Sequence, residues 1–221
     1  MRAQLLADIK QVLGKAVPPN LTSRSKGHDL YEAYIFTLVV RAAKRSAATV
    51  GYRNRDGSAP KTFMFRTGPG EIASGNYSHA VLAFFGKPEL EVHTDIYISG
   101  ASKVPHESDV CVLLRDEATL CRTSPLQPLP RYSSLKLAVE CKFYESSGIG
   151  VALGRGVMGL SKEFGARRTF FVTSREAASV EALLAHHGQP WATAVVPKST
   201  EKVNRLVSNF ETIFENFKAK K

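Results

Sequence analysis

The spacing of apolar residues along the chain predicts several amphipathic helices. Residues 3 to 15 and 29 to 46 carry apolar side chains at intervals of three and four positions, which is the period of a helix with one buried face. The same spacing recurs in residues 151 to 164, 176 to 187 and 200 to 218. Pro18, Pro19 and Asn20 are expected to end the first helix, because proline interrupts helical hydrogen bonding.

Shorter apolar runs, several with strict alternation, predict β-strands between these helices. They occupy residues 49 to 54, 61 to 66, 91 to 99, 108 to 115, 135 to 144, 168 to 173 and 192 to 196. Asp56 and Gly57 are expected to join the first two runs in a hairpin-like connection. Residues 79 to 85 suit a helix or a strand equally, and the proline-rich residues 123 to 132 are expected to form a loop. The pattern predicts one domain over residues 1 to 221.

The charge balance adds a candidate partner to this picture. The chain carries 30 Lys and Arg residues against 20 Asp and Glu, a net charge of +10. Residues 41 to 66 hold seven of the basic residues and the single acid Asp56. Such a patch favours polyanions, of which nucleic acid is the usual one. The alternative is a solvated face that only aids solubility.

The cysteines and the N-terminus argue for a cytoplasmic protein without a membrane segment. Cys111, Cys121 and Cys141 have no paired spacing, so buried free thiols in a reducing compartment are expected rather than zinc or disulfides. Asp8 and Lys10 interrupt the apolar N-terminal residues, which excludes a signal-peptide core. The longest apolar stretch, residues 34 to 40, is too short to span a membrane.

Two of the predicted strands place candidate catalytic residues at their ends. Alternation in residues 135 to 144 puts Glu140 and Lys142 on one face, opposite apolar neighbours, and Asp109 opens the run that precedes it. Two carboxylates and a lysine at strand ends suit a Mg²⁺-dependent phosphodiester hydrolase, because Mg²⁺ prefers carboxylate oxygens and keeps open positions for water and phosphate. The alternative is a structural Glu–Lys pair on a wet strand, worth about 0–1 kcal/mol.

Each residue of this group has an expected role. Asp109 and Glu140 are the natural metal ligands, with the backbone carbonyl of Cys141 available beside them. Lys142 would orient or help deprotonate the attacking water and offset the developing charge. Glu32 lies on the apolar stripe of its helix, where a carboxylate is costly unless a metal or Lys142 meets it. Alternatively, Glu32 sits in the first helical turn, where the helix dipole favours an acid.

These motifs resemble the restriction-endonuclease-like superfamily of PD-(D/E)xK nucleases over residues 28 to 175. Asp109 resembles the motif's Asp, Glu140 and Lys142 its (D/E)xK, and Glu32 the acid often found on the first core helix. The resemblance implies an α/β fold with an αβββαβ core, a central mixed sheet flanked by helices, and helical extensions at residues 1 to 20 and 176 to 221. It also implies a DNA substrate and dependence on Mg²⁺, for which Mn²⁺ is expected to substitute.

The chain departs from the superfamily pattern in two places. Pro105 does not adjoin Asp109, which leaves Glu107 as a weaker rival for the metal. Many members carry a glutamine on the helix after the lysine strand, where this chain offers Arg155, a candidate phosphate contact. Arg53 and Arg55, in the basic stretch, are expected to follow the DNA backbone through contacts that do not depend on sequence.

The leading hypothesis is a Mg²⁺-dependent endodeoxyribonuclease of a restriction, defence or repair type. A homodimer is favoured by the need to cut both strands of a duplex. The second hypothesis is a non-catalytic nucleic-acid-binding module on the same fold. The third is a nucleotide-cofactor enzyme, suggested by Gly154, Gly156 and Gly159. Those glycines fall inside a predicted helix rather than in a turn after a strand, so close packing of that helix on the sheet is the favoured explanation.

Overall fold

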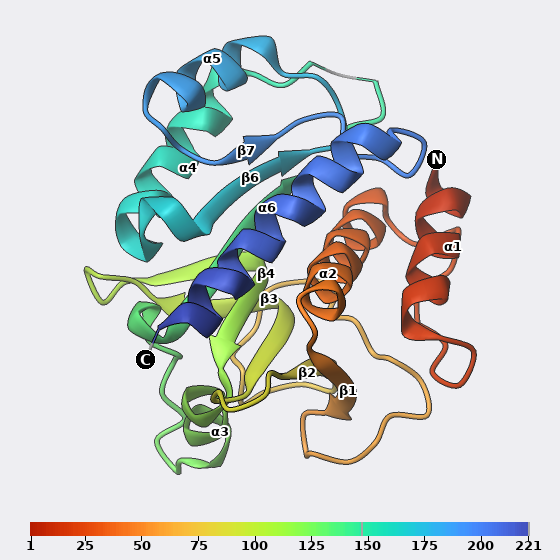
Figure 1. Cartoon of the computed structure of the whole chain (residues 1–221), viewed down its shortest axis with the longest axis vertical. Coiled ribbons are helices and arrows are strands. Elements are labelled where there is room, and N and C mark those ends of the chain that lie inside the picture. The colour runs from red at the N-terminus through yellow and green to blue at the C-terminus, as the bar shows by residue number, and fades with distance from the viewer. Residues whose placement is uncertain (147, 221) are drawn as a thin grey trace.

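The computed structural model describes residues 1–146 and 148–220, and it has a seven-stranded mixed β-sheet between two layers of helices (Figure 1). The helices are α1 (Arg2–Leu13), α2 (Gly27–Arg45), α3 (Arg115–Thr123), α4 (Val151–Phe164), α5 (Ala178–His186) and α6 (Thr200–Ala219). The strands are β1 (Thr49–Asn54), β2 (Ser78–Ala83), β3 (Leu90–Ser99), β4 (Pro105–Leu114), β5 (Leu135–Lys142), β6 (Thr169–Thr173) and β7 (Trp191–Ala192). The predicted α/β class and mixed sheet are confirmed.

The strands lie in the sheet in the order in which they occur along the chain. Antiparallel pairing joins β1 through β5, and β5, β6 and β7 then pair in parallel. Parallel neighbours need a crossover connection, and α4 and α5 provide the two crossovers. The carboxyl ends of β5, β6 and β7 therefore point the same way.

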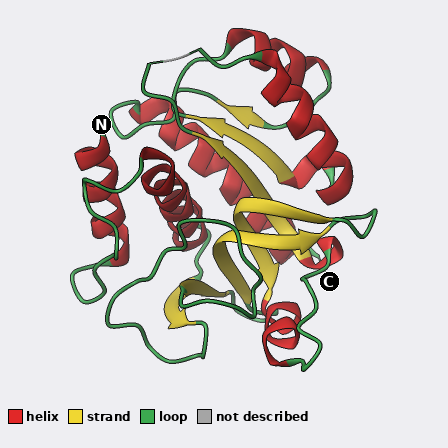
Figure 2. Ribbon diagram, turned by 180° about the vertical axis from the view of Figure 1, so that it is seen from behind, coloured by secondary structure: helices red, strands yellow, loops and turns green. Residues whose placement is uncertain are grey.

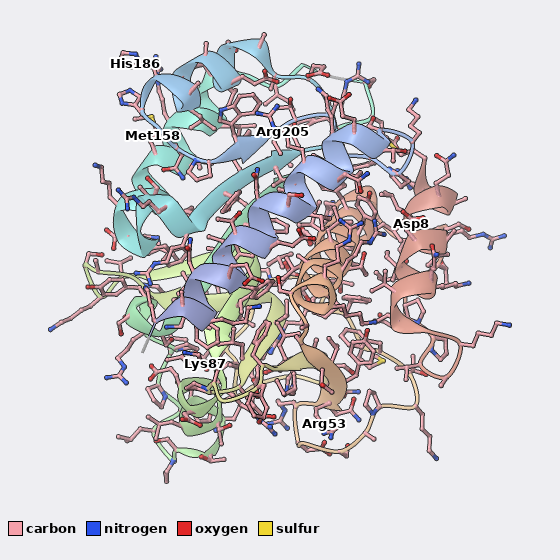
Figure 3. All side chains as sticks on the ribbon, viewed as in Figure 1. Asp8, Arg53, Lys87, Met158, His186 and Arg205 are labelled. Carbon is pink, nitrogen blue, oxygen red and sulfur yellow. The ribbon has the colours of Figure 1, made fainter. Side chains whose placement is uncertain are left out.

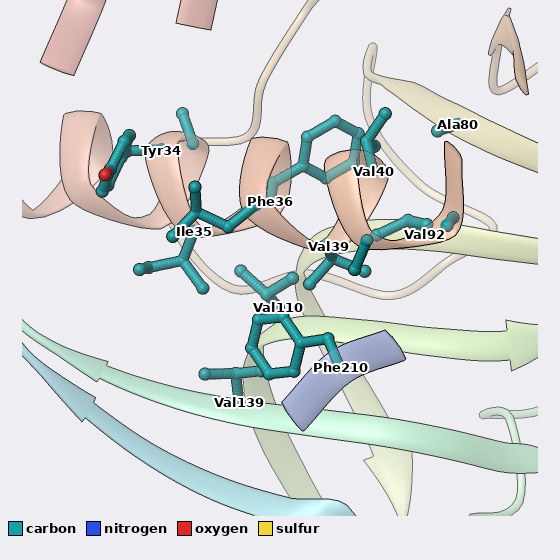
Figure 4. Close-up of a cluster of buried hydrophobic side chains, with 14 of the residues drawn as sticks. Tyr34, Ile35, Phe36, Val39, Val40, Ala80, Val92, Val110, Val139 and Phe210 are labelled. Carbon is teal, nitrogen blue, oxygen red and sulfur yellow. The ribbon is translucent and has the colours of Figure 1, made fainter. Parts of the chain in front are cut away.

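The helices cover both faces of this sheet (Figures 1 and 2). On one face α2 and α6 pack directly on the strands, and α1 packs against α2. Val39 of α2 and Phe210 of α6 lie beside Val110 and Val139 of the central strands there (Figure 4). Burying a side chain of this size contributes about 1.5–3 kcal/mol. The other face carries α3, α4 and α5.

Most predicted elements are present, and β1 and α4 have the predicted bounds. Residues 79 to 85, which the sequence left undecided, contain most of β2. The strand predicted for residues 61 to 66, with its hairpin to β1, is wrong because β1 pairs with β2 instead. Phe63 and Phe65 are buried, but their backbone bonds to the loop at Pro18 and Asn20.

Further corrections concern helix ends and one additional helix. The first helix ends at Leu13, before the prolines, because Gly14 adopts φ 87°, a conformation that glycine tolerates best. Helix α3 was not predicted. The three cysteines are free and buried, as expected. Within residues 1–146 and 148–220, no helix combines the length and the apolar character needed to cross a membrane.

Candidate active site

Acidic side chains from three neighbouring strands align in one row across the sheet. The pairing registers place three residues side by side on β3, β4 and β5: Thr94, Val110 and Val139. The next position on each strand, toward the same edge of the sheet, is occupied by Asp95, Asp109 and Glu140. Asp95 and Asp109 are buried, and Glu140 is partly exposed. Strand register therefore brings together carboxylates that lie far apart along the chain.

The Asp109 carboxylate takes the place of a backbone acceptor where β4 and β5 separate. The pairing of these strands ends at Val110 and Val139 on this side, and Asp109 Oδ2 accepts a hydrogen bond from the Cys141 backbone N–H at 2.6 Å. The N–H and C=O of one strand residue point toward the same neighbouring strand. The Cys141 carbonyl, which the sequence analysis named as a candidate metal ligand, therefore faces the Asp109 side of β5.

Lys142 lies within contact distance of two of these carboxylates. Its Nζ atom is 2.6 Å from Glu140 Oε1 and 3.8 Å from Asp109 Oδ2. Burial opposes the charged form, but the Asp109 and Glu140 carboxylates together raise the pKa of Lys142 above its usual value. Lys142 is therefore held as an ammonium group in this arrangement. Such a group can donate hydrogen bonds and stabilise negative charge, whereas a general base would have to be neutral.

Asp95 is a candidate site residue that the sequence reasoning missed. Carboxylate oxygens of Glu32, Asp95 and Asp109 all lie within 4.8 Å of one another. The Asp95 backbone has φ 51°, a left-handed conformation that is uncommon outside glycine and often found at functional sites. A signal was present in the predicted strand, where Glu91, His93 and Asp95 alternate with Val92, Thr94 and Ile96. Three ionisable groups on one side of a strand indicate a polar site rather than a surface that is simply exposed to water.

Crowding of these acids shifts their protonation. Burial, followed by repulsion from Asp95 and Asp109, raises the pKa of Glu32 to about 10. Burial, followed by repulsion from the Asp109 carboxylate, raises the pKa of Asp95 to about 8. Burial and Glu140 raise the pKa of Asp109 to about 7, with Lys142 acting in the opposite direction. A set of crowded carboxylate oxygens with excess negative charge is the donor set that a hard divalent cation such as Mg²⁺ prefers.

A close contact between β5 and α2 positions Glu32. A Cβ atom added at Gly27, the first residue of α2, would lie 2.2 Å from the ring of Phe143, which follows β5. The Phe143 ring also packs on Tyr31, with 5.7 Å between centroids. Glu32 is the sixth residue of α2, beyond the first turn. Its close neighbours are two aspartates rather than Lys142, so of the two expected explanations its position favours the metal site.

The predicted DNA-binding arginines all lie on the surface of the protein. Arg53 is exposed on β1, at the far edge of the sheet from β7 (Figure 3). Arg55 is exposed and donates to the Ala73 carbonyl at 2.8 Å, in a loop whose Gly70 N–H donates to the Asp95 carbonyl at 3.0 Å. Arg155 is exposed on α4. The loop after β1 therefore links the basic stretch to the strand that carries Asp95.

The rival ligand Glu107 lies two residues before Asp109 on β4 and is partly exposed. Burial and the nearby Glu140 raise the pKa of Glu107. Its carboxylate does not belong to the compact group formed by Glu32, Asp95 and Asp109. Among the described residues, Asp109 is thus the more central of the two candidates.

The three glycines of α4 do not form a phosphate-binding turn. Gly154 is buried inside the helix, and a Cβ atom there would lie 3.1 Å from both Val180 and Leu183 of α5. The glycine therefore permits close packing of α4 on α5, and α4 also contacts β5 and β6 of the sheet. Gly156 and Gly159 face open space. This geometry gives the nucleotide-cofactor hypothesis no support.

A second group of ionisable side chains lies under α3. Glu91 is fully buried and accepts two hydrogen bonds from Arg122, at 2.6 and 2.7 Å. The Nε2 atoms of His93 and His79 lie 3.0 and 3.4 Å from the same carboxylate. Both Nδ1 atoms are buried without a partner among the described residues, whereas a metal-bound histidine normally donates its second N–H. This group is best explained as a buried ion-pair network.

Comparison with protein-family models, with curated proteins and with solved structures finds no match for this chain. The geometry of the site is therefore the basis on which a function can be assigned.

Proposed function

We propose that this protein is a cytosolic, Mg²⁺-dependent endodeoxyribonuclease with a restriction-endonuclease-like core formed by α2, β3, β4, β5, α4 and β6. The observation that carries the proposal is the row of Asp95, Asp109 and Glu140 with the Lys142 ammonium group beside it. Carboxylates at adjacent strand ends can hold a metal ion that activates water, and a lysine beside them can stabilise the charge that develops on a phosphate.

In this proposal Asp109, Glu140 and the Cys141 carbonyl hold Mg²⁺, and Glu32 and Asp95 complete the acidic site around Asp109. Mg²⁺ held there would supply charge neutralisation at the scissile phosphate and an activated water. Lys142 donates hydrogen bonds that position the water and offset the negative charge that develops on the phosphate oxygens. Mn²⁺ has similar ligand preferences and is expected to substitute.

The net charge of +10 supports a polyanionic substrate. Arg53, Arg55 and Arg155 are all exposed, and we propose that they contact DNA phosphates outside the catalytic centre. A homodimer would provide the two sites needed to cut both strands of a duplex.

Plasmid nicking tests the proposal with wild-type protein and the Lys142→Ala variant, each in Mg²⁺ and in EDTA. We expect nicking by wild type in Mg²⁺ alone and a loss of roughly 10²–10³-fold in Lys142→Ala, since one stabilising cation is removed from the developing charge. Lys202→Ala is the matched control, because Lys202 also contacts a carboxylate, Glu176, but on the surface of α6.

Equal residual activity in all samples would defeat the enzyme proposal. DNA binding without nicking in Mg²⁺ would instead support a non-catalytic nucleic-acid-binding module. Nicking by Lys202→Ala at the wild-type rate is required before the loss in Lys142→Ala is assigned to the site.

A further inference from the structure

A basic cleft of about 720 Å³ lies at the opposite end of β5 from the acidic row. It is bordered by the start of β5, the turn before β6 and the last part of α6. Four cationic residues line it: Lys136, Arg167, Arg168 and Lys220. None of the described residues that line it is Asp or Glu. Lys87 donates to the Lys220 carbonyl just beyond α6, which brings a further cation next to Lys220 (Lys87 is labelled in Figure 3).

A β-bulge directs Lys136 toward this cleft. Val112 pairs with Leu137 and Leu113 pairs with Leu135, so Lys136 has no partner on β4. A bulge of this kind bends the strand and re-aims the extra side chain. Lys136 is partly buried, and its Nζ atom lies 5.9 Å from the centre of the Phe217 ring on α6.

Backbone carbonyls hold Arg168 in place beside it. Its Nη1 atom donates to the Leu135 carbonyl at 2.6 Å, and its Nε atom donates to the Phe164 carbonyl. A fixed guanidinium group loses little side-chain freedom when it binds an anion. Arg167 is exposed next to it. The cleft thus combines one fixed cation with others that can adjust to a ligand.

Bringing these like charges together has an electrostatic cost, since the described residues that line the cleft include no carboxylate side chain. Burial, followed by repulsion from Lys220 and Arg168, lowers the pKa of Lys136. Like charges in a partly buried site disfavour the charged forms, and a bound anion reverses that effect. Paired guanidinium and ammonium donors are the groups that recognise phosphate.

We propose that this cleft is a second binding site for phosphate groups, separate from the acidic row. Lys136 precedes Lys142 by six residues on the same strand, which is about 20 Å at about 3.3 Å per residue. The phosphate comes either from a nucleic-acid backbone or from a small polyphosphate. Its assignment to the DNA backbone depends on the proposed nuclease function, whereas phosphate binding itself does not.

Thermal unfolding in EDTA with added pyrophosphate tests phosphate binding without any cleavage. The proteins are wild type, the double variant Lys136→Gln/Arg167→Gln, and the charge-matched control Lys10→Gln/Lys15→Gln on and after α1. Pyrophosphate at a hundredfold excess over Kd should raise the Tm of wild type and control by about 5 °C or more. The double variant should lose this shift and, without pyrophosphate, should be at least as stable as wild type because like charges have been removed.

Equal pyrophosphate shifts in wild type and double variant would overturn the proposal. Binding of a 20-base-pair duplex in EDTA then identifies the source of the phosphate. If the source is DNA, the slope of log K for duplex binding against log salt concentration should be less steep in the double variant by about 2. The reason is that two phosphate contacts are lost. An unchanged slope with a lost pyrophosphate shift would assign the cleft to a small polyphosphate. Absence of Mg²⁺-dependent nicking would defeat the nuclease proposal but leave these binding results standing.

Discussion

At Asp95 two unfavourable features coincide, a left-handed backbone and a carboxyl group crowded by two other acids. A non-glycine residue in this conformation costs of order 1–3 kcal/mol, and burial beside Asp109 adds a further electrostatic cost. Neither feature improves the fold. Both are consistent with a residue placed to share a cation with Glu32 and Asp109.

Replacing Asp95 with asparagine should separate its contribution to chemistry from its contribution to stability. Asp95→Asn is expected to lower the Mg²⁺-dependent nicking rate by roughly 10²-fold, because a carboxylate of the metal site is lost. The same substitution should raise the Tm of the metal-free protein, because one repelling acid is removed. Asp116→Asn, on the exposed first turn of α3, is the control. A nicking rate within twofold of wild type would exclude Asp95 from the site.

Among the elements, α3 is tied to the sheet by its buried ion pair. Burial alone would raise the pKa of Glu91, but hydrogen bonds from His79, His93 and Arg122 lower it well below the usual range. The side chain of Arg122 is only 11% exposed. Breaking a buried pair leaves one charge without compensation, which is costlier than losing a surface pair.

Arg122→Met should therefore lower the free energy of unfolding by about 3–5 kcal/mol. Urea denaturation measures this change. Lys202→Met provides the comparison, since its exposed pair with Glu176 should contribute about 0–1 kcal/mol. Equal small losses in both variants would show that the contact between Arg122 and Glu91 does not anchor α3.

The elements that sequence reasoning predicted incorrectly have identifiable physical causes. Helix α3 lacks an apolar stripe, because its buried face includes Glu117, which pairs with Arg131. In the segment of residues 61 to 66, Phe63 and Phe65 alternate with less buried residues as in a strand. Alternation does not say which backbone a segment will bond to, and here the loop at Asn20 supplies the partners.

In the candidate site, too, local patterns identify single residues but do not say which strands pair. Local patterns identified Asp109, Glu140 and Lys142, because each lies in a strand with a clear apolar period. Their alignment with Asp95 depends on the pairing of β3, β4 and β5, which no local pattern encodes. The repulsion among these acids likewise becomes visible only when α2 is packed on the sheet.

At the scale of the whole molecule, the acidic site couples stability to pH. Unfolded Asp and Glu lose their protons near pH 4, whereas the folded, metal-free protein retains protons on Glu32, Asp95 and Asp109 because their pKa values are raised. Above pH 4 the unfolded chain therefore binds fewer protons than the folded one, and stability falls as pH rises. A bound divalent cation favours the ionised carboxylates and opposes this loss.

The Tm in EDTA should accordingly fall between pH 5 and pH 8.5, and Mg²⁺ should raise it more at pH 8.5 than at pH 5. Thermal unfolding at the two pH values, with and without Mg²⁺, measures both effects. In the double variant Glu32→Gln/Asp95→Asn the fall and the response to Mg²⁺ should both be smaller. A Mg²⁺ effect of the same size in the double variant would place the ion elsewhere.

The contact of Gly27 with the Phe143 ring joins the beginning of α2 to the end of β5. Because the helix carries Glu32 and the strand carries Lys142, the two halves of the site are set relative to each other when the chain folds. The entropy of assembling them is then lost once, during folding, rather than at every encounter with a ligand. A larger side chain in place of Gly27 would therefore disturb the relative positions of Glu32 and Lys142 without contacting either of them.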